Sequence, residues 1–98
     1  MSVVMKIKSQ IIEKEDISSL NFPSYSLNKT PEEKRELKRK LRNAQILGNI
    51  HRNKIRIIFE DESNRKEVRT TVWAAGEKHI VLKGGVIIPI RRIVDVRL

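Results

Sequence analysis

The sequence predicts an α+β fold that is mainly β, with one N-terminal helix packed on a five-stranded, strongly bent antiparallel barrel. Three observations support this fold class. A strong helix-start signal occurs at Thr30, the hydrophobic period changes from helical to alternating at Lys54, and tight turns divide the following residues into short segments. So small a sheet would expose unpaired edges, and closure into a barrel removes them.

Residues 1–29 are interpreted as an N-terminal arm, and residues 30–98 as one domain of helix plus barrel. Apolar and basic residues alternate over 3–8, which predicts a short edge strand. Serine, asparagine and proline then predict a loop with one short helical turn at 16–20. Four apolar residues of the arm are expected to pin it to the barrel: Leu20, Phe22, Tyr25 and Leu27.

The helix is expected to begin after Thr30 and to end at Gly48. Thr30 can cap the amide of Glu33 while the Glu33 side chain reaches back, and Pro31 needs no N–H at the first helical position. Gly48 is the residue type that adopts the left-handed cap conformation without steric clash, so the helix should run to about Leu47. Helical spacing then gives an apolar face of Leu37, Leu41 and Ala44 and a basic face of Arg35, Lys38, Arg39 and Arg42.

Five strands are expected after the helix. The second is long, 65–75, and should bend because a small sheet rarely accommodates a straight strand of that length. With only 4% aromatic residues, the aliphatic core is expected to be anchored by Trp73, with Phe59 and Phe22; for Trp73, flanked by Val72 and Ala74, the alternative is a stacking platform for bases. The other strands are expected at 55–59, 79–82, 86–88 and 93–98, joined by turns at 61–64, 76–77 and 84–85 and by a break at 89–92.

Charge is the strongest global property of the chain. The formal net charge is +9, and the excess lies in residues 31–53 and 54–98. A positive field of this size favours polyanionic partners through steering and counterion release. The chain has no cysteine, which excludes disulfides and cysteine-ligated metals. No segment has the run of roughly 18 apolar residues of a membrane span, and no signal peptide is evident, so a cytoplasmic protein without a membrane partner is expected.

No constellation of residues predicts catalysis. His51 and His79 are far apart in the sequence and make a poor metal set. The acidic residues 60–62 fall in an expected turn, where solvated carboxylates are more typical than acid–base groups. Lys83 precedes two glycines, but the spacing of a P-loop is absent. The sequence therefore predicts a protein that is not an enzyme and needs no cofactor, metal or small-molecule substrate.

The segment 80–93, IVLKGGVIIPIRRI, together with the order of elements over 30–98, resembles the Sm-like (SH3-like) fold of Sm proteins, the Hfq host factor and the C-terminal domain of ribosome maturation factors. The pattern TTxWA followed by LKGG is also similar to small proteins of Bacteroidetes that supply no function. The Sm-like resemblance implies RNA contacts from the loops at 76–78 and 91–92, at one end of the barrel. The loop AGEK at 75–78 lacks the family's base-holding residues, which favours binding dominated by phosphate contacts.

The leading hypothesis is a non-enzymatic RNA-binding or ribosome-associated module. Arginine and lysine bind phosphate oxygens, and guanidinium groups do so in a bidentate manner. The alternative is a protein-interaction module that forms a homo-oligomer or takes an acidic protein partner. The candidate nucleic-acid-binding residues are Arg35, Lys38, Arg39, Arg42, Lys78, Lys83, Arg91 and Arg92.

Overall fold

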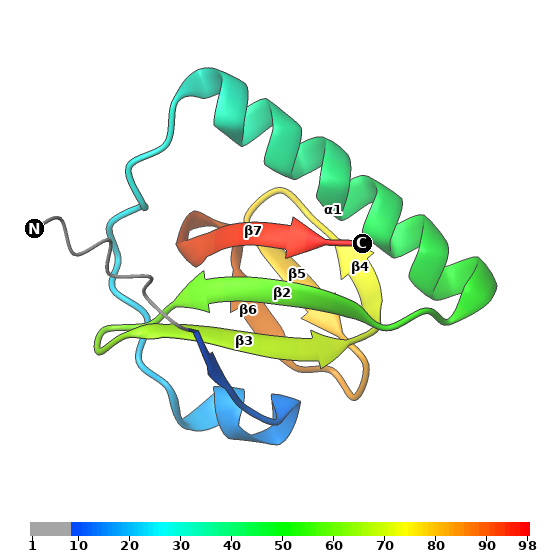
Figure 1. Ribbon diagram of the computed structural model, residues 1–98, viewed down its shortest axis with the longest axis horizontal. Coiled ribbons are helices and arrows are strands. Elements are labelled where there is room, and N and C mark those ends of the chain that lie inside the picture. Colours follow the sequence, from blue (N-terminus) through cyan, green and yellow to red (C-terminus); the bar gives the residue numbers. More distant parts are fainter. Residues whose placement is uncertain (1–8) are drawn as a thin grey trace, which may run out of the picture.

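The computed structural model describes residues 9–98, which form one long helix and seven strands in two sheets (Figure 1). A four-stranded sheet has the order β1-β3-β2-β7, and a three-stranded sheet has the order β4-β5-β6. The helix α1 covers Pro31–His51, and the short 3-10 helices are η1, Lys14–Ser19, and η2, Ile90–Arg92. The strands are β1, Gln10–Ile11; β2, Ile55–Glu60; β3, Arg65–Thr70; β4, Val72–Ala75; β5, His79–Leu82; β6, Ile87–Pro89; and β7, Ile93–Arg97.

The prediction of a closed five-stranded antiparallel barrel is wrong. The expected long strand breaks at Thr71, so that β3 stays in the four-stranded sheet while β4 pairs with β5 in the other. The free edges of the two sheets, β7 and β4, do not pair with each other, and α1 contacts both of them. A helix rather than hydrogen-bonded closure therefore covers this side. The sheet is not wholly antiparallel either, because β1 runs parallel to β3.

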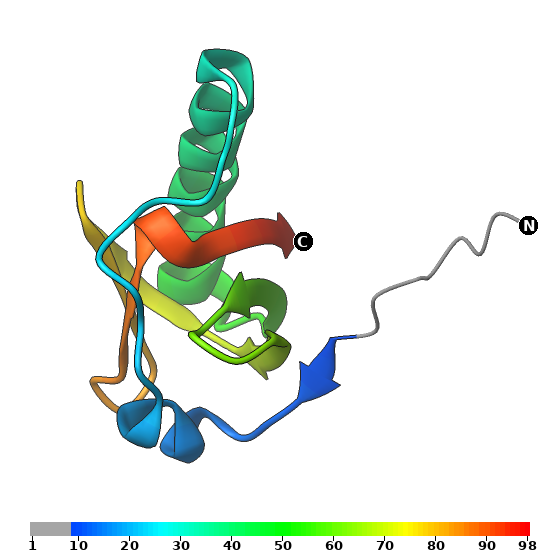
Figure 2. The ribbon, with the colours of Figure 1, turned by 90° about the vertical axis from the view of Figure 1, so that its left-hand side faces the viewer.

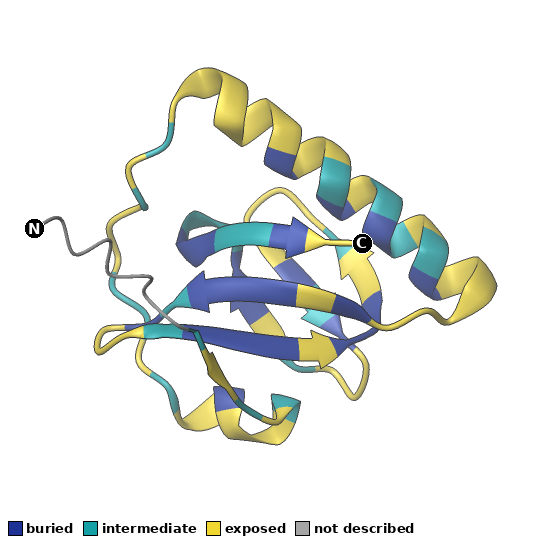
Figure 3. Cartoon of the chain, in the orientation of Figure 1, coloured by how far each residue is buried: buried dark blue, intermediate teal, exposed yellow. Residues whose placement is uncertain are grey.

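The core lies between the two sheets, with a helix at each open side. The long helix α1 covers the side of β4 and β7, and η1 covers the side of β3 and β6, where Ile17 is buried. Figure 3 shows the division in α1, whose core-facing residues are buried while its outer face is exposed. The core residues are Ile17, Leu37, Leu41, Ala44, Ile55, Ile57, Phe59, Val68, Val72, Ile80, Leu82, Ile88, Ile93 and Val96.

The predicted start of the helix is confirmed. The Glu33 amide donates to Thr30 Oγ1 at 3.1 Å, the Thr30 amide donates to Glu33 Oε1 at 2.9 Å, and Pro31 opens the helix. The bond from the Thr30 amide to the Glu33 carboxylate, with a smaller contribution from the Thr30 side chain, holds the pKa of Glu33 below its usual value, because it stabilises the charged form.

Removing the cap should destabilise the protein modestly. We expect Thr30→Ala to lower the free energy of unfolding by about 1 kcal/mol, because the Glu33 amide loses its acceptor at the exposed helix end. Urea unfolding followed by circular dichroism measures this change. Thr30→Ser, which keeps the hydroxyl, is the matched control, and a loss of equal size in both variants would contradict the capping role.

The predicted helix end at Gly48 is wrong. The helix continues to His51, and Arg52 takes the left-handed cap conformation with φ of 54° while its amide donates to the Gly48 carbonyl. Gly48 is instead buried inside the helix, where a Cβ atom would lie 2.2 Å from the carbonyl oxygen of Val72. The glycine therefore allows α1 to lie close to β4, and it does not end the helix.

Trp73 is not a core anchor, contrary to the prediction, because it is 49% exposed. In β4 the side chain of Val72 is fully buried, and the register of the β4–β5 pair shifts between Val72 and Ala74. Trp73, which directly follows the buried Val72 in the strand, lies on the outer surface. The prediction for Phe59 is confirmed: it is fully buried, and its ring centroid lies 5.8 Å from that of the partly buried Phe22.

The prediction of solvated carboxylates in the turn after β2 is wrong for Asp61, which is buried and paired with the buried Lys66 at 2.6 Å. The register explains why a lysine lies there. Lys66 faces Phe59 across the β2–β3 pair, so it occupies a core-facing position at the end of the sheet.

The arm crosses one end of the molecule, from η1 to the start of α1 (Figure 2). Leu20 and Phe22 pack on the core as expected, whereas Tyr25 is mostly exposed. The described edge strand is β1, and the alternating residues 3–8 lie outside the described residues. Within residues 9–98, no helix combines the length and the apolar run that crossing a bilayer requires.

Candidate nucleic-acid interface

On the four-stranded sheet the cations have acidic partners. Glu67 is buried there and accepts from Arg56 at 2.9 and 3.1 Å and from Arg69 at 3.3 Å. The hydrogen bonds from Arg56 hold the pKa of Glu67 below its usual value, and those from Arg69 add to this effect. Asp95 on β7 pairs with Lys40 at 2.9 Å and contacts Arg97 at 4.0 Å. Each of these cations is therefore in an ion pair, although two carboxylates offset only part of their charge.

Uncompensated charge is concentrated along α1 and around the three-stranded sheet. Among residues 9–98, the cations there that make neither an ion pair nor a side-chain hydrogen bond are Lys34, Arg35, Lys38, Arg42, Arg52, Lys54, Lys78 and Lys83. All eight are exposed. Their field is not cancelled locally, and it is available to an anionic partner.

Three hollows follow one another along one side of α1, the first between the helix, the arm and η2 and the other two between the helix and β4, and we call them together the α1 groove. The first has a volume of about 220 Å³, the middle one about 290 Å³ and the last about 400 Å³. Lys38 and Ile90 line both the first and the middle hollow, so these two adjoin. From Lys34 in the first to Arg52 in the last, the groove follows the helix for roughly 27 Å, at 1.5 Å per residue.

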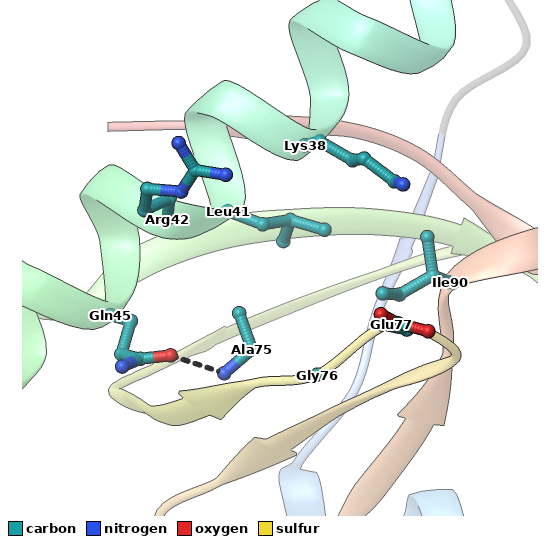
Figure 4. A pocket seen from close by; sticks show the side chains of 8 residues that line it. All are labelled: Lys38, Leu41, Arg42, Gln45, Ala75, Gly76, Glu77 and Ile90. Atoms are coloured by element: carbon teal, nitrogen blue, oxygen red, sulfur yellow. Dashed lines mark hydrogen bonds between the residues drawn. The ribbon is translucent and has the colours of Figure 1, made fainter.

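The middle hollow shows how the groove is built (Figure 4). Gln45 Oε1 accepts from the Ala75 amide at 2.6 Å, which satisfies the free edge of β4 and fixes its distance from the helix. Leu41 and Ile90 point into the hollow from opposite sides, and Lys38 extends from α1 toward the end where Ile90 and Glu77 lie. The hollow therefore has an apolar floor and a basic rim, with Glu77 as its acidic lining residue.

The four residues of the predicted basic helix face divide between two sides of α1. Lys38 and Arg42 line the α1 groove, whereas Arg35 and Arg39 lie outside the residues that line it. Arg39 donates to Glu36 at 3.0 and 2.5 Å, and these bonds lower the pKa of Glu36. Lys38 and Arg42 thus keep free cationic groups at the groove, while Arg39 is partly compensated.

The predicted cations outside the helix do not form one cluster, because β5 separates Lys78 from Lys83. Lys78 lies beside η2, because its carbonyl accepts from the Ile90 amide at 2.9 Å, as expected for two loops at one end of the molecule. Lys83 lies at the opposite end of β5 and lines the last hollow. Five residues of extended chain separate the two by roughly 16 Å.

The two arginines of η2 are engaged with the arm. Arg91 Nε donates to the Pro23 carbonyl at 2.9 Å, and Arg91 also lines the first hollow. Arg92 is buried, donates to the carbonyls of Glu60 at 3.0 Å and Tyr25 at 3.2 Å, and lies 5.1 Å from the centre of the Tyr25 ring. Arg92 therefore ties the arm to the sheet, and its guanidinium is directed at carbonyls of the chain itself.

Sequence reasoning missed four residues of the α1 groove: Lys34, Arg52, Lys54 and Trp73. Lys34 and Arg52 share a side of the helix with Lys38 at the spacing of whole turns, so a helix extended to His51 would have revealed this line. Trp73 directly follows Val72, which is buried, so strand alternation is the signal that could have placed Trp73 outside.

No protein-family model, curated protein or solved structure matches this chain. The resemblance to Sm-like proteins thus receives neither support nor contradiction from known proteins. Among residues 9–98, no three histidine, aspartate or glutamate side chains come together as a metal site would require. The shape and charge of the α1 groove are therefore the features that indicate a function.

Proposed function

We propose that this protein is a non-enzymatic RNA-binding module that holds the phosphate backbone in the α1 groove. The observation that carries the proposal is the line of uncompensated cations along one continuous side of α1, from Lys34 through Lys38 and Arg42 to Arg52. The cations of the four-stranded sheet have acidic partners that offset part of their charge, whereas the cations of this line have none among the described residues, so the excess charge is greater on the groove side.

The chemistry of the groove fits phosphates better than a small molecule. Its cations are exposed, and each hollow is open to solvent and lined by both apolar and basic groups. Backbone phosphates need such point charges and guanidinium forks at intervals, and they carry no sequence information. We therefore expect strong salt dependence with little sequence preference.

Two paired charge-removal variants test the proposal. We expect Lys38→Gln/Arg42→Gln to weaken binding to single-stranded RNA and to reduce the slope of log K against log salt by about 1.4, since each lost phosphate contact reduces the slope by about 0.7. Fluorescence anisotropy of labelled single-stranded RNA, duplex RNA and duplex DNA at several salt concentrations measures the slopes and the preference.

The matched control, Arg69→Gln/Arg97→Gln, removes the same charge from the exposed residues of the four-stranded sheet. The salt slope of this control should stay near that of the unmodified protein. A third variant, Glu77→Gln, removes the acidic group of the middle hollow and should strengthen RNA binding. Equal slopes for the two double variants would show that net charge alone acts and would contradict the groove.

An oligomerisation module is the alternative, and one observation favours it. Ile46 and Ile50 lie one turn apart on α1 and are 48% and 68% exposed. A protein that self-associates through them would show a mass that rises with concentration in light scattering, and Ile50→Lys would abolish the rise. A constant monomer mass in the range where RNA binds would contradict this alternative.

A further inference from the structure

The last hollow of the α1 groove differs from the other two because it contains an aromatic ring. Trp73 on β4 is 49% exposed and lines it together with Arg52 and Lys54, which follow α1, and Lys83, which follows β5. Asn49 and Thr71 add an amide and a hydroxyl, and no described residue that lines the hollow is acidic. Three cations thus surround one exposed indole.

An exposed tryptophan at a rigid position points to a partner that covers it. Burial of so large an apolar surface is favourable by roughly 25 cal/mol per Å², yet the fold leaves half of this side chain in water. The three neighbouring cations disfavour an apolar protein surface there, because docking would strip water from charges that have no acidic partner in the hollow.

We propose that Trp73 is a stacking platform for an unpaired base, with Arg52, Lys54 and Lys83 holding the phosphates on either side of it. Every base has a π-face and is bonded through its sugar to phosphates, so an aromatic ring among cations matches the chemistry of a nucleotide within a strand. This inference rests on the proposed function and makes it more specific: the partner is a single strand, since bases in a duplex are stacked on one another.

The backbone around the subsite is well fixed. The Lys83 amide donates to the Thr71 carbonyl at 2.9 Å, and Gly84 and Gly85, with φ of 88° and 85°, close the tight turn that follows Lys83. On the other side, the close approach of Gly48 to Val72 places the end of α1 beside β4. A platform held on such rigid elements can bind a base with little loss of conformational freedom.

Trp73 is the only tryptophan in the chain, so its fluorescence reports directly on the subsite. We expect a single-stranded oligoribonucleotide to quench this fluorescence on binding, and an abasic strand of the same length to bind without the same quenching. We expect Trp73→Ala to weaken binding of the base-containing strand roughly 5- to 150-fold, the range typical of base stacking on aromatic side chains. Binding of the abasic strand and the salt slope should be unchanged.

Trp73→Phe is the second variant, and it should recover a large part of the affinity because it keeps an aromatic face. We expect both variants to fold, because the side chain is half exposed and outside the core, and circular dichroism with urea unfolding tests this. If Trp73→Ala binds each strand as tightly as the unmodified protein does, and neither protein prefers the base-containing strand, the proposed stacking subsite is wrong while the phosphate groove stands. If no strand binds, the proposed function itself is wrong. If the fluorescence changes with protein concentration alone, self-association covers Trp73 and the subsite is likewise wrong.

Discussion

Asp61→Asn should lower the free energy of unfolding by about 3–5 kcal/mol, the largest loss that we expect from any isosteric change in this protein. The carboxylate is buried at the end of the core, and its Oδ2 accepts from Lys66 Nζ at 2.6 Å. The side chains of the pair are 3% and 8% exposed. Replacement by an amide leaves the ammonium of Lys66 buried without a counter-charge, and this uncompensated charge is the main source of the loss.

Asparagine is chosen because it keeps the turn. Asp61 Oδ1 accepts from the amides of Ser63 and Asn64 at 2.9 Å and from the Ser63 hydroxyl at 3.0 Å. An asparagine oxygen can accept the same three bonds, so the variant removes the charge and leaves the hairpin geometry. Asp61→Ala, which also removes these bonds, should be less stable still.

The effect should depend on pH in a defined direction. Burial acts to raise the pKa of Asp61, but the hydrogen bonds from Lys66, from the amides of Asn64 and Ser63 and from the Ser63 hydroxyl outweigh it and hold the pKa well below its usual value. A carboxyl whose pKa is lowered on folding stabilises the protein above its unfolded pKa of about 4, and this contribution is lost as the pH falls through the folded pKa. The difference in stability between the unmodified protein and Asp61→Asn should therefore be constant from pH 7 to about 5 and shrink below pH 4.

Urea unfolding at several pH values measures this difference, and a double-mutant cycle isolates the pair. Lys66→Met leaves Asp61 with its three other bonds, so it should be less damaging than Asp61→Asn. Adding Lys66→Met to Asp61→Asn should restore stability, because it removes the orphaned charge. Additive losses, or a difference that does not change at low pH, would contradict a buried ion pair at this turn.

The sequence predicts features of this fold that depend on neighbours along the chain. The capping box at Thr30 and the alternating segments at 55–59 and 79–82 are local patterns, and the structure has the corresponding elements close to the expected positions. Closure depends on contacts between distant segments. Whether β4 and β7 pair with each other or leave room for a helix is decided by the packing of α1, which has no local signature.

In the candidate site, too, features that depend on local spacing could be predicted and those that depend on distant contacts could not. Lys38 and Arg42 could be assigned to a basic surface from helical spacing alone, and they do line the α1 groove. Arg92 could not be assigned, because its partners are the carbonyls of Glu60 and Tyr25, which are distant from it in the sequence. The sequence predicts Trp73 in the core because Val72 and Ala74 flank it in mid-strand, whereas the structure buries Val72 and leaves Trp73 half exposed.

The role of Gly48 also could not be read from the sequence, which predicts a helix cap there rather than a close contact with β4. Substitution of Gly48 is the second change for which we expect a large loss of stability. We expect Gly48→Ala to lower the free energy of unfolding by about 1–3 kcal/mol or more through overpacking, although alanine is the better helix former by about 1 kcal/mol. The new Cβ would lie 2.2 Å from the carbonyl oxygen of Val72 and 3.0 Å from the methyl group of Thr71. Val72 cannot move aside easily, since β4 is paired with β5 and the Thr71 carbonyl accepts from the Lys83 amide.

Thermal unfolding measures the change, at about 4–8 °C in melting temperature for each kcal/mol in a domain of this size. Asn49→Ala, at the exposed neighbouring position, is the matched control and should be neutral or slightly stabilising in the same assay. If Gly48 were merely a weak helix residue, Gly48→Ala would instead raise the melting temperature, and the close approach of α1 to β4 would be contradicted.

The same substitution links the fold to the proposed binding. The helix end that Gly48 places beside β4 also positions Arg52, across the last hollow from Trp73 and Lys83. A Cβ at Gly48 must push the end of α1 away from β4 and so separate the cation from the ring. Folded Gly48→Ala should therefore bind single-stranded RNA less tightly than His51→Gly, a helix-weakening change at an exposed residue of the same helix end that lines none of the three hollows, even though Gly48 offers the strand no side chain.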